Sequence, residues 1–111
     1  MNVIHKNEGA KVQYTVRGSK ITFDDEVTYN LAKYERDEDS HIDLCRDKFG
    51  NLVSGVIPGM AERYVAQIDI PGRSYDYVLD GEDEDGNPKQ KQVAVPLDMD
   101  NVTLTLWSME D

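Results

Sequence analysis

Residues 63–70 read Arg63-Tyr64-Val65-Ala66-Gln67-Ile68-Asp69-Ile70 and are followed by Pro71-Gly72. Apolar side chains recur there at every second position, which is the period of a β-strand with one buried face. Polar side chains hold the alternate positions, apart from Val65. Pro71 has no N–H to donate to a neighbouring strand and Gly72 permits a turn, so the strand is expected to end there. We interpret this stretch as the central strand of a β domain, with Tyr64, Ala66, Ile68 and Ile70 facing inward.

The same alternation recurs along most of the chain, in short segments separated by turns that contain Gly, Pro or Asp. The segments are residues 11–17, 20–23, 40–46, 52–57, 74–79, 93–97 and 102–107, and they show no internal repeat. About eight short strands joined by tight turns are typical of an antiparallel sandwich or barrel. We therefore predict an all-β fold, a small antiparallel β-sandwich or barrel.

Residues 26–36 fit two structures. Val27, Tyr29 and Leu31 alternate as in a strand, whereas Val27, Leu31 and Tyr34 form a helical stripe. The β-branched and aromatic start favours a strand, and this is the prediction that we adopt. The alternative is an α+β fold with one helix near 26–36.

One hairpin can be predicted together with its register. Gly18-Ser19 lies between two alternating segments, and Gly in the first position of a two-residue loop indicates a type II′ turn. Such a loop pairs Val16 with Ile21 and Tyr14 with Phe23, so that apolar side chains face apolar partners. It also pairs Thr15 with Thr22 and Arg17 with Lys20.

The domain organisation is expected to be simple. Residues 1–10 show no period and predict a loose or edge-docked N-terminal arm, and residues 11–111 predict a single β domain. Residues 80–90 hold too little apolar surface to pack and predict a mobile loop. We expect no membrane-spanning segment and no secretory signal, because no apolar run is long enough and residues 1–8 contain no apolar stretch. The single Cys45 excludes an internal disulfide and fits a reducing compartment, so we expect a cytoplasmic (host cell interior) or virion-associated protein.

Charge limits the partners. Acidic residues outnumber basic ones 22 to 12, and the formal net charge is −10. Binding to nucleic acid or to an anionic membrane depends on Lys and Arg, so neither is expected. The acids gather at residues 24–26, 35–39 and 80–85, where the alternation breaks, and we interpret these clusters as solvated loops. The alternative is an acidic face that meets a basic partner or mimics a nucleic acid.

We expect no catalytic residue. His41, Asp43 and Cys45 share one face of a predicted strand, but residues four apart on a strand lie ~13 Å apart, too far for a thiol and its base. We also expect no cofactor and no metal site. The acidic run before Gly86 fails the EF-hand pattern, because setting Gly86 at position six places Gly81 at one and Gln92 at twelve. An irregular Ca²⁺ site is the remaining alternative.

The aromatic residues divide into two groups. Tyr14, Tyr64, Tyr75 and Tyr77 lie on the apolar phase of their segments and are expected in the core. Trp107 falls on the opposite phase to Leu104 and Leu106, beside threonines. An exposed Trp more often marks a protein interface than a sugar site, so Trp107 is the candidate interface residue.

Two stretches, residues 63–71 and Met99-Asp100-Asn101-Val102-Thr103-Leu104-Thr105-Leu106-Trp107, carry a resemblance, together with Asp24-Asp25 and residues 42–47. They resemble segments of small uncharacterised proteins encoded in phages and prophages of gut Firmicutes. The resemblance implies a phage context and assigns no functional residue.

Three functions follow as hypotheses. The first is a non-catalytic β domain that acts through protein–protein contacts, with self-association expected, as a virion or assembly component of a phage. The second is a binding module for Ca²⁺ or carbohydrate. The third is an acidic inhibitor that mimics nucleic acid. An enzyme is not expected.

Overall fold

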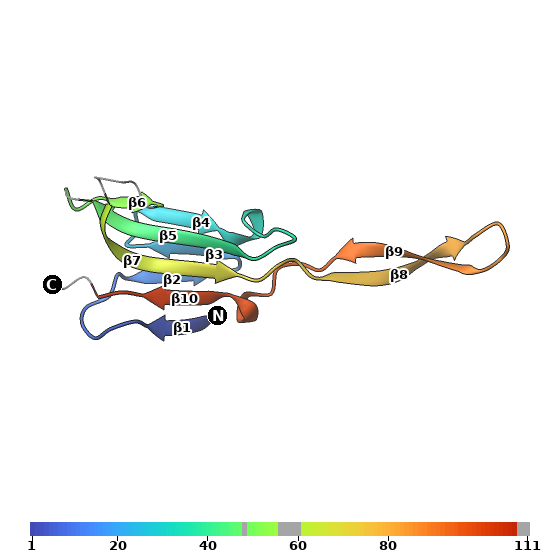
Figure 1. Cartoon of the computed structure of the whole chain (residues 1–111), viewed down its shortest axis with the longest axis horizontal. Coiled ribbons are helices and arrows are strands. Elements are labelled where there is room, and N and C mark those ends of the chain that lie inside the picture. Colours follow the sequence, from blue (N-terminus) through green and yellow to red (C-terminus); the bar gives the residue numbers. More distant parts are fainter. Residues whose placement is uncertain (48, 56–60, 109–111) are drawn as a thin grey trace.

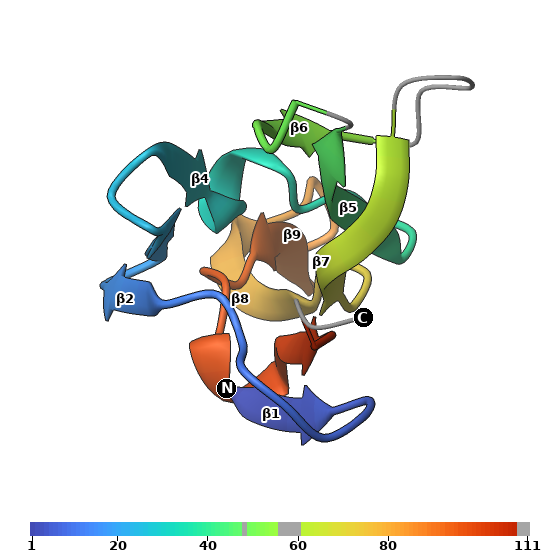
Figure 2. The ribbon, with the colours of Figure 1, turned by 90° about the vertical axis from the view of Figure 1, so that its left-hand side faces the viewer.

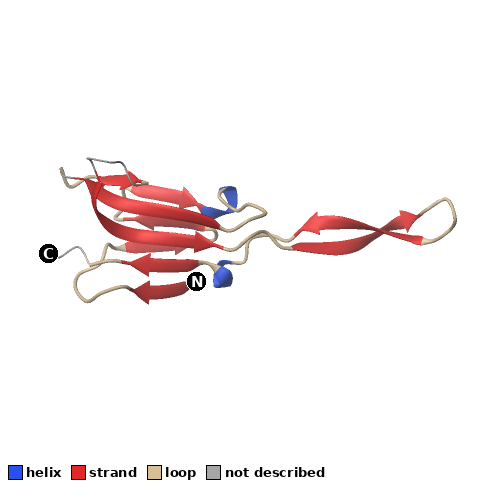
Figure 3. Ribbon diagram, viewed as in Figure 1, coloured by secondary structure: helices blue, strands red, loops and turns tan. Residues whose placement is uncertain are grey.

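The computed structural model describes residues 1–47, 49–55 and 61–108. Within them the chain forms ten β-strands and two single-turn 3₁₀ helices, so the predicted all-β class is confirmed (Figures 1 and 3). The strands make three separate sheets of five, three and two strands. The five- and three-stranded sheets form a body, and the two-stranded sheet projects from it as a long hairpin (Figure 1). No helix within the described residues has the length and apolar character needed to cross a membrane.

The large sheet has the order β1-β10-β7-β5-β6. Its strands are β1 (Asn2–His5), β5 (Ser40–Asp47), β6 (Leu52–Ser54), β7 (Ala61–Ile70) and β10 (Thr103–Leu106). All neighbours run antiparallel except β1 and β10, which are parallel. The N-terminal arm predicted at residues 1–10 therefore takes its edge-docked form over residues 2–5. The partner strand predicted over 52–57 is β6, and the end predicted for it at residues 58–59 lies outside the described residues.

The small sheet contains β2 (Tyr14–Arg17), β3 (Lys20–Phe23) and β4 (Val27–Asn30). The pairs between β2 and β3 are the four predicted from the Gly18-Ser19 turn, so that register is confirmed. Gly18 has a φ of 58°, as the first turn residue of a type II′ hairpin requires. Beyond β4 the chain makes one 3₁₀ turn, η1 (Leu31–Lys33), so the strand predicted near 26–36 is shorter than expected and no α-helix follows it.

The core lies between the large and small sheets. Figure 2 shows the large sheet curving from β6 through β7 to β1, with the small sheet on the opposite side. The small sheet and η1 contribute Ile21, Phe23, Tyr29 and Leu31 to the core, and the large sheet contributes Ile42, Leu44, Ile68, Ile70, Leu104 and Leu106. A hydrogen bond between the Tyr29 and Ser54 hydroxyls joins the small sheet to β6. The body is thus a sandwich with one apolar interior.

A β-bulge in β7 changes the face on which Tyr64 lies. Leu44 pairs with Ala66 and Cys45 pairs with Tyr64, which leaves Val65 as the extra residue. Val65 and Ala66 are both buried, whereas Tyr64 is 37% exposed. The expectation of a core Tyr64 is therefore wrong, because strict alternation does not continue through the bulge.

The long hairpin consists of β8 (Tyr75–Glu82) and β9 (Pro88–Ala94), which pair antiparallel and only with each other among the described strands. It gives the chain extents of 68 × 25 × 22 Å and a radius of gyration of 18.9 Å. A compact chain of this length would have a radius of gyration of about 13 Å. The single domain predicted over 11–111 thus has a projection outside its body, and the loop predicted over 80–90 is the distal half of that hairpin.

Candidate functional site

Alternation along the long hairpin creates two unlike faces. The strand register places Tyr75 opposite Ala94, Tyr77 opposite Gln92 and Leu79 opposite Gln90. We call this side the uncharged face, defined by Tyr75, Tyr77, Leu79, Gln90, Gln92 and Ala94. The other side, the charged face, carries Asp76, Val78, Asp80, Lys89, Lys91 and Val93.

The long hairpin exposes apolar side chains on both faces. Tyr77 is 66% exposed and Leu79 is 73% exposed on the uncharged face. Val78 and Val93 are also exposed, on the charged face. The expectation that Tyr77 lies in the core is therefore wrong, because no second layer of the fold covers this sheet. Tyr14 and Tyr75, expected in the core with it, are partly buried.

The tip of the hairpin is a turn that satisfies its own polar groups. One carboxylate oxygen of Asp83 accepts hydrogen bonds from the backbone N–H groups of Asp85 and Asn87, at 2.9 and 2.8 Å. Gly86 has a φ of 79° and donates its N–H to the Asp83 carbonyl. Across the described residues, no group of three or more His, Cys, Asp or Glu side chains is arranged to hold a metal ion. The acidic residues at the tip thus form a hydrogen-bonded turn, and backbone N–H groups of that turn engage the Asp83 carboxylate.

The base of the hairpin is held by acidic residues 35–39, which we call the anchor loop. The Arg73 guanidinium donates to the Glu35 carbonyl at 2.9 Å and lies 3.5 Å from the Glu35 carboxylate. The Tyr75 hydroxyl donates to the Asp37 carboxylate. The Gly72 N–H donates to the Asp39 carboxylate at 2.8 Å. This acidic cluster, interpreted from the sequence as a solvated loop, therefore fixes the direction in which the hairpin leaves the body.

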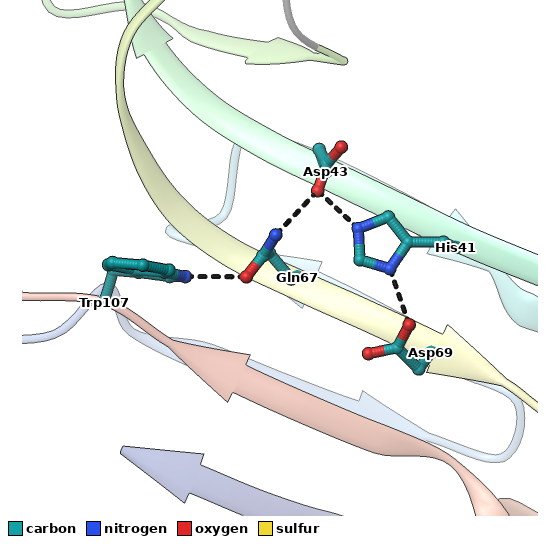
Figure 4. Close-up of polar contacts among 5 residues, drawn as sticks. All are labelled: His41, Asp43, Gln67, Asp69 and Trp107. Carbon is teal, nitrogen blue, oxygen red and sulfur yellow. Dashed lines mark hydrogen bonds and ion pairs between the residues drawn. The ribbon is translucent and has the colours of Figure 1, made fainter. Parts of the chain in front are cut away.

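A chain of polar contacts crosses the outer face of the large sheet (Figure 4). The Trp107 indole N–H donates to the Gln67 amide oxygen at 2.8 Å, and the Gln67 amide N–H donates to Asp43 at 3.0 Å. The His41 ring then joins Asp43 to Asp69, with 2.5 Å from each ring nitrogen to a carboxylate oxygen. The strand register explains the cluster, because Asp43 pairs with Gln67 and His41 pairs with Asp69.

The electrostatics of this face favour a charged His41. The hydrogen bond to Asp69 raises the pKa of His41 most, burial opposes it, and the hydrogen bond to Asp43 raises it further. Both ring nitrogens of His41 lie within hydrogen-bond distance of a carboxylate, and the contact with Asp69 ties β5 to β7. Burial raises the pKa of the Cys45 thiol, and the charge of Asp43 adds to this effect. A thiol with a raised pKa is a weak nucleophile at neutral pH.

The surroundings of Trp107 are aromatic and basic. Its ring stacks on Tyr64 with 5.5 Å between the ring centroids, and the Lys6 ammonium lies 5.6 Å from the Trp107 ring centroid. Trp107 is half-buried by these contacts rather than standing free in solvent. The sequence places it correctly on the outer face but gives no sign of Tyr64 and Lys6 as its neighbours.

The exposed apolar side chains of the long hairpin were not predicted from the sequence. Tyr77 and Leu79 look like core residues when only their alternation is considered. A sequence signal for a tight turn at the hairpin tip was present, because Asp83 begins the pattern Asp-x-x-Gly-Asn that Asp47 also begins.

Comparison of the chain with protein-family models, with curated proteins and with solved structures finds no match.

Proposed function

We propose that the chain is a non-catalytic structural β domain that acts through protein–protein contacts, chiefly with its own copies. The long hairpin is the contact element in this proposal. A phage particle is the setting proposed for it, on the strength of the sequence resemblance.

The observation that carries this proposal is the exposed uncharged face. A two-stranded sheet is marginally stable at best in water unless something packs against it. Tyr77 and Leu79 are 66% and 73% exposed, and removing such side chains from water is favourable by about 1.5–3 kcal/mol each. A partner surface is therefore the simplest means of stabilising the hairpin.

The outer face of the large sheet supports a structural role more than a chemical one. His41 is held between carboxylates and Cys45 is buried, so neither is presented as a nucleophile or a base. Trp107 and Tyr64 form a half-buried aromatic pair. We propose Trp107 as a secondary contact residue.

The other two hypotheses have less support. A Ca²⁺ site at the hairpin tip would compete with the two backbone N–H groups that already bond to Asp83. A nucleic-acid mimic would present its acids together to solvent, whereas Glu35, Asp37 and Asp39 engage the base of the hairpin.

Light scattering over a concentration series tests the proposal. We expect the wild-type chain to form oligomers, and we expect Tyr77→Ser combined with Leu79→Ser to weaken them at least about tenfold, since each lost apolar contact is worth about 1 kcal/mol or more. Phe49→Ser is the matched control, because Phe49 is also 73% exposed but lies at a turn of the body. A wild-type chain that stays monomeric at millimolar concentration would rule the proposal out.

A further inference from the structure

We propose that the long hairpins of neighbouring copies join edge to edge, with β8 of one copy against β9 of the next, so that the copies share one continuous sheet. This inference rests on the proposed self-association and specifies its geometry. Three observations carry it: free edges on both hairpin strands, opposite charges on those strands, and a body wider than the hairpin.

Both strands of the hairpin have a free edge. Among the described strands, β8 bonds only to β9 and β9 only to β8. Each therefore presents an outer row of backbone N–H and C=O groups, which is the template for adding a further strand. Pro88 interrupts the donor row of β9 only at its distal end.

The charges of the two strands are opposite. Strand β8 carries Asp76, Asp80 and Glu82 and no basic residue, whereas β9 carries Lys89 and Lys91 and no acidic residue. Pairing β8 with β8 would bring carboxylates together, and pairing β9 with β9 would bring ammonium groups together. Like charges on neighbouring strands are destabilising and opposite charges are stabilising. The pairing of β8 with β9 of another copy is the only edge pairing that the charges favour.

This pairing also extends the uncharged face. If the added strand runs antiparallel, as β8 and β9 do within one chain, each copy continues the same alternation of faces. Tyr77 and Leu79 of one copy then lie on the same side of the sheet as those of the next. Side chains on neighbouring strands cover one another, so part of this apolar surface leaves the water.

The shape of the chain prevents the shared sheet from being flat. A contact between unlike edges is heterologous and produces either rings or open filaments. Each hairpin occupies two strands, or about 10 Å of sheet. The body accounts for the two shorter extents of the molecule, 25 and 22 Å (Figures 1 and 2). Bodies this wide cannot stack at the spacing of the hairpins in a flat row, so neighbouring copies must splay and the shared sheet must curve or twist.

A charge-swapped chain tests this geometry. The variant combines Asp76→Lys, Asp80→Lys, Lys89→Asp and Lys91→Asp, which keeps opposite charges within each hairpin. Edge pairing of β8 with β9 predicts that the variant assembles with itself but not with the wild type, since every mixed contact joins like charges. Native mass spectrometry of isotope-labelled wild type mixed with the variant measures this sorting. Labelled and unlabelled wild type serve as the control and should mix at random.

The outcomes separate this inference from the proposed function. Random mixing of wild type and variant, or a preference for mixed assemblies, would overturn the edge pairing while leaving self-association intact. A monomeric wild type would overturn both. Lys89→Gln with Lys91→Gln gives a second, milder test, because losing two opposite-charge contacts should weaken assembly about tenfold. Unchanged assembly of this variant would also count against the pairing.

Discussion

A Cβ atom built on Gly72 would lie 2.7 Å from the carbonyl oxygen of Asp37. The backbone of the anchor loop thus passes directly over the start of the long hairpin. We expect Gly72→Ala to force one backbone away from the other and to lower the free energy of unfolding by about 1–3 kcal/mol. Urea unfolding followed by Trp107 fluorescence measures the change. Ser74→Ala is the control, since Ser74 is exposed and engages Val95 through its carbonyl alone.

The ion pairs of His41 predict a pH-dependent contribution to stability. Because the folded-state pKa is raised, the folded state holds the proton more tightly than the unfolded chain does. The contribution is therefore complete below the ordinary His pKa of about 6.5 and disappears as the pH rises through the folded-state value. The difference in unfolding free energy between wild type and His41→Gln should shrink over that range. A difference that grows with pH would contradict the assignment.

The same site predicts a direct titration result. The ring resonances of His41 should titrate with a midpoint above about 6.5 in nuclear magnetic resonance spectra. Asp69→Asn should lower that midpoint more than Asp43→Asn does, because the hydrogen bond to Asp69 is the largest single cause of the raised pKa. Equal effects of the two substitutions would show that the two carboxylates hold the ring equally.

Cys45 should be protected from modification in the folded protein. Its side chain is buried and its pKa is raised by that burial, so the thiolate fraction at pH 8 is small. We expect slow reaction with an aromatic disulfide reagent in buffer and fast reaction in denaturant, followed by absorbance. Cys45→Ser gives the blank for the assay. Reaction in buffer at the rate of a free thiol would show that the Cys45 side chain is accessible to solvent in the folded protein.

The two Asp-x-x-Gly-Asn turns offer a matched comparison. Asp47 accepts from the N–H groups of Phe49 and Asn51 just as Asp83 accepts from those of its own turn. Asp47 is buried in the body, so Asp47→Ala should cost about 1–3 kcal/mol of unfolding free energy. Asp83→Ala should change the unfolding of the body much less, because the hairpin is a separate sheet. Chemical denaturation of both variants with Trp107 fluorescence makes the comparison.

Local sequence patterns predict much of the fold. The Gly18-Ser19 turn gives the full register of β2 and β3, because turn geometry and apolar alternation agree there. Alternation likewise identifies β5, β7 and β10. It fails at Tyr64, where the Val65 bulge shifts the phase, and at Tyr77, where alternation exists without a covering layer. A two-residue period reports an extended chain, and burial depends on whether another sheet lies above it.

The candidate site was only partly accessible from the sequence. Strand phase places His41 and Asp43 on the polar side of one segment and Trp107 on the polar side of another, but it does not show that the two segments share a sheet. Their partners Gln67 and Asp69 depend on the alignment of β5 with β7, which no local pattern specifies. The anchor loop could not be foreseen at all, because the contact between residues 35–39 and 72–75 is a property of the folded chain.

The parallel pairing of β1 with β10 has a consequence for how the body is made. Asn2 aligns with Thr103 and His5 with Leu106, so β1 can take its place in the sheet only after β10 has been synthesised. Closing so long a loop is entropically demanding and slows folding. The pairs of β2 with β3 and of β8 with β9 join segments that are close in the sequence and need no such wait. Completion of the large sheet is therefore a late event, held back until the whole span between these two strands has been translated.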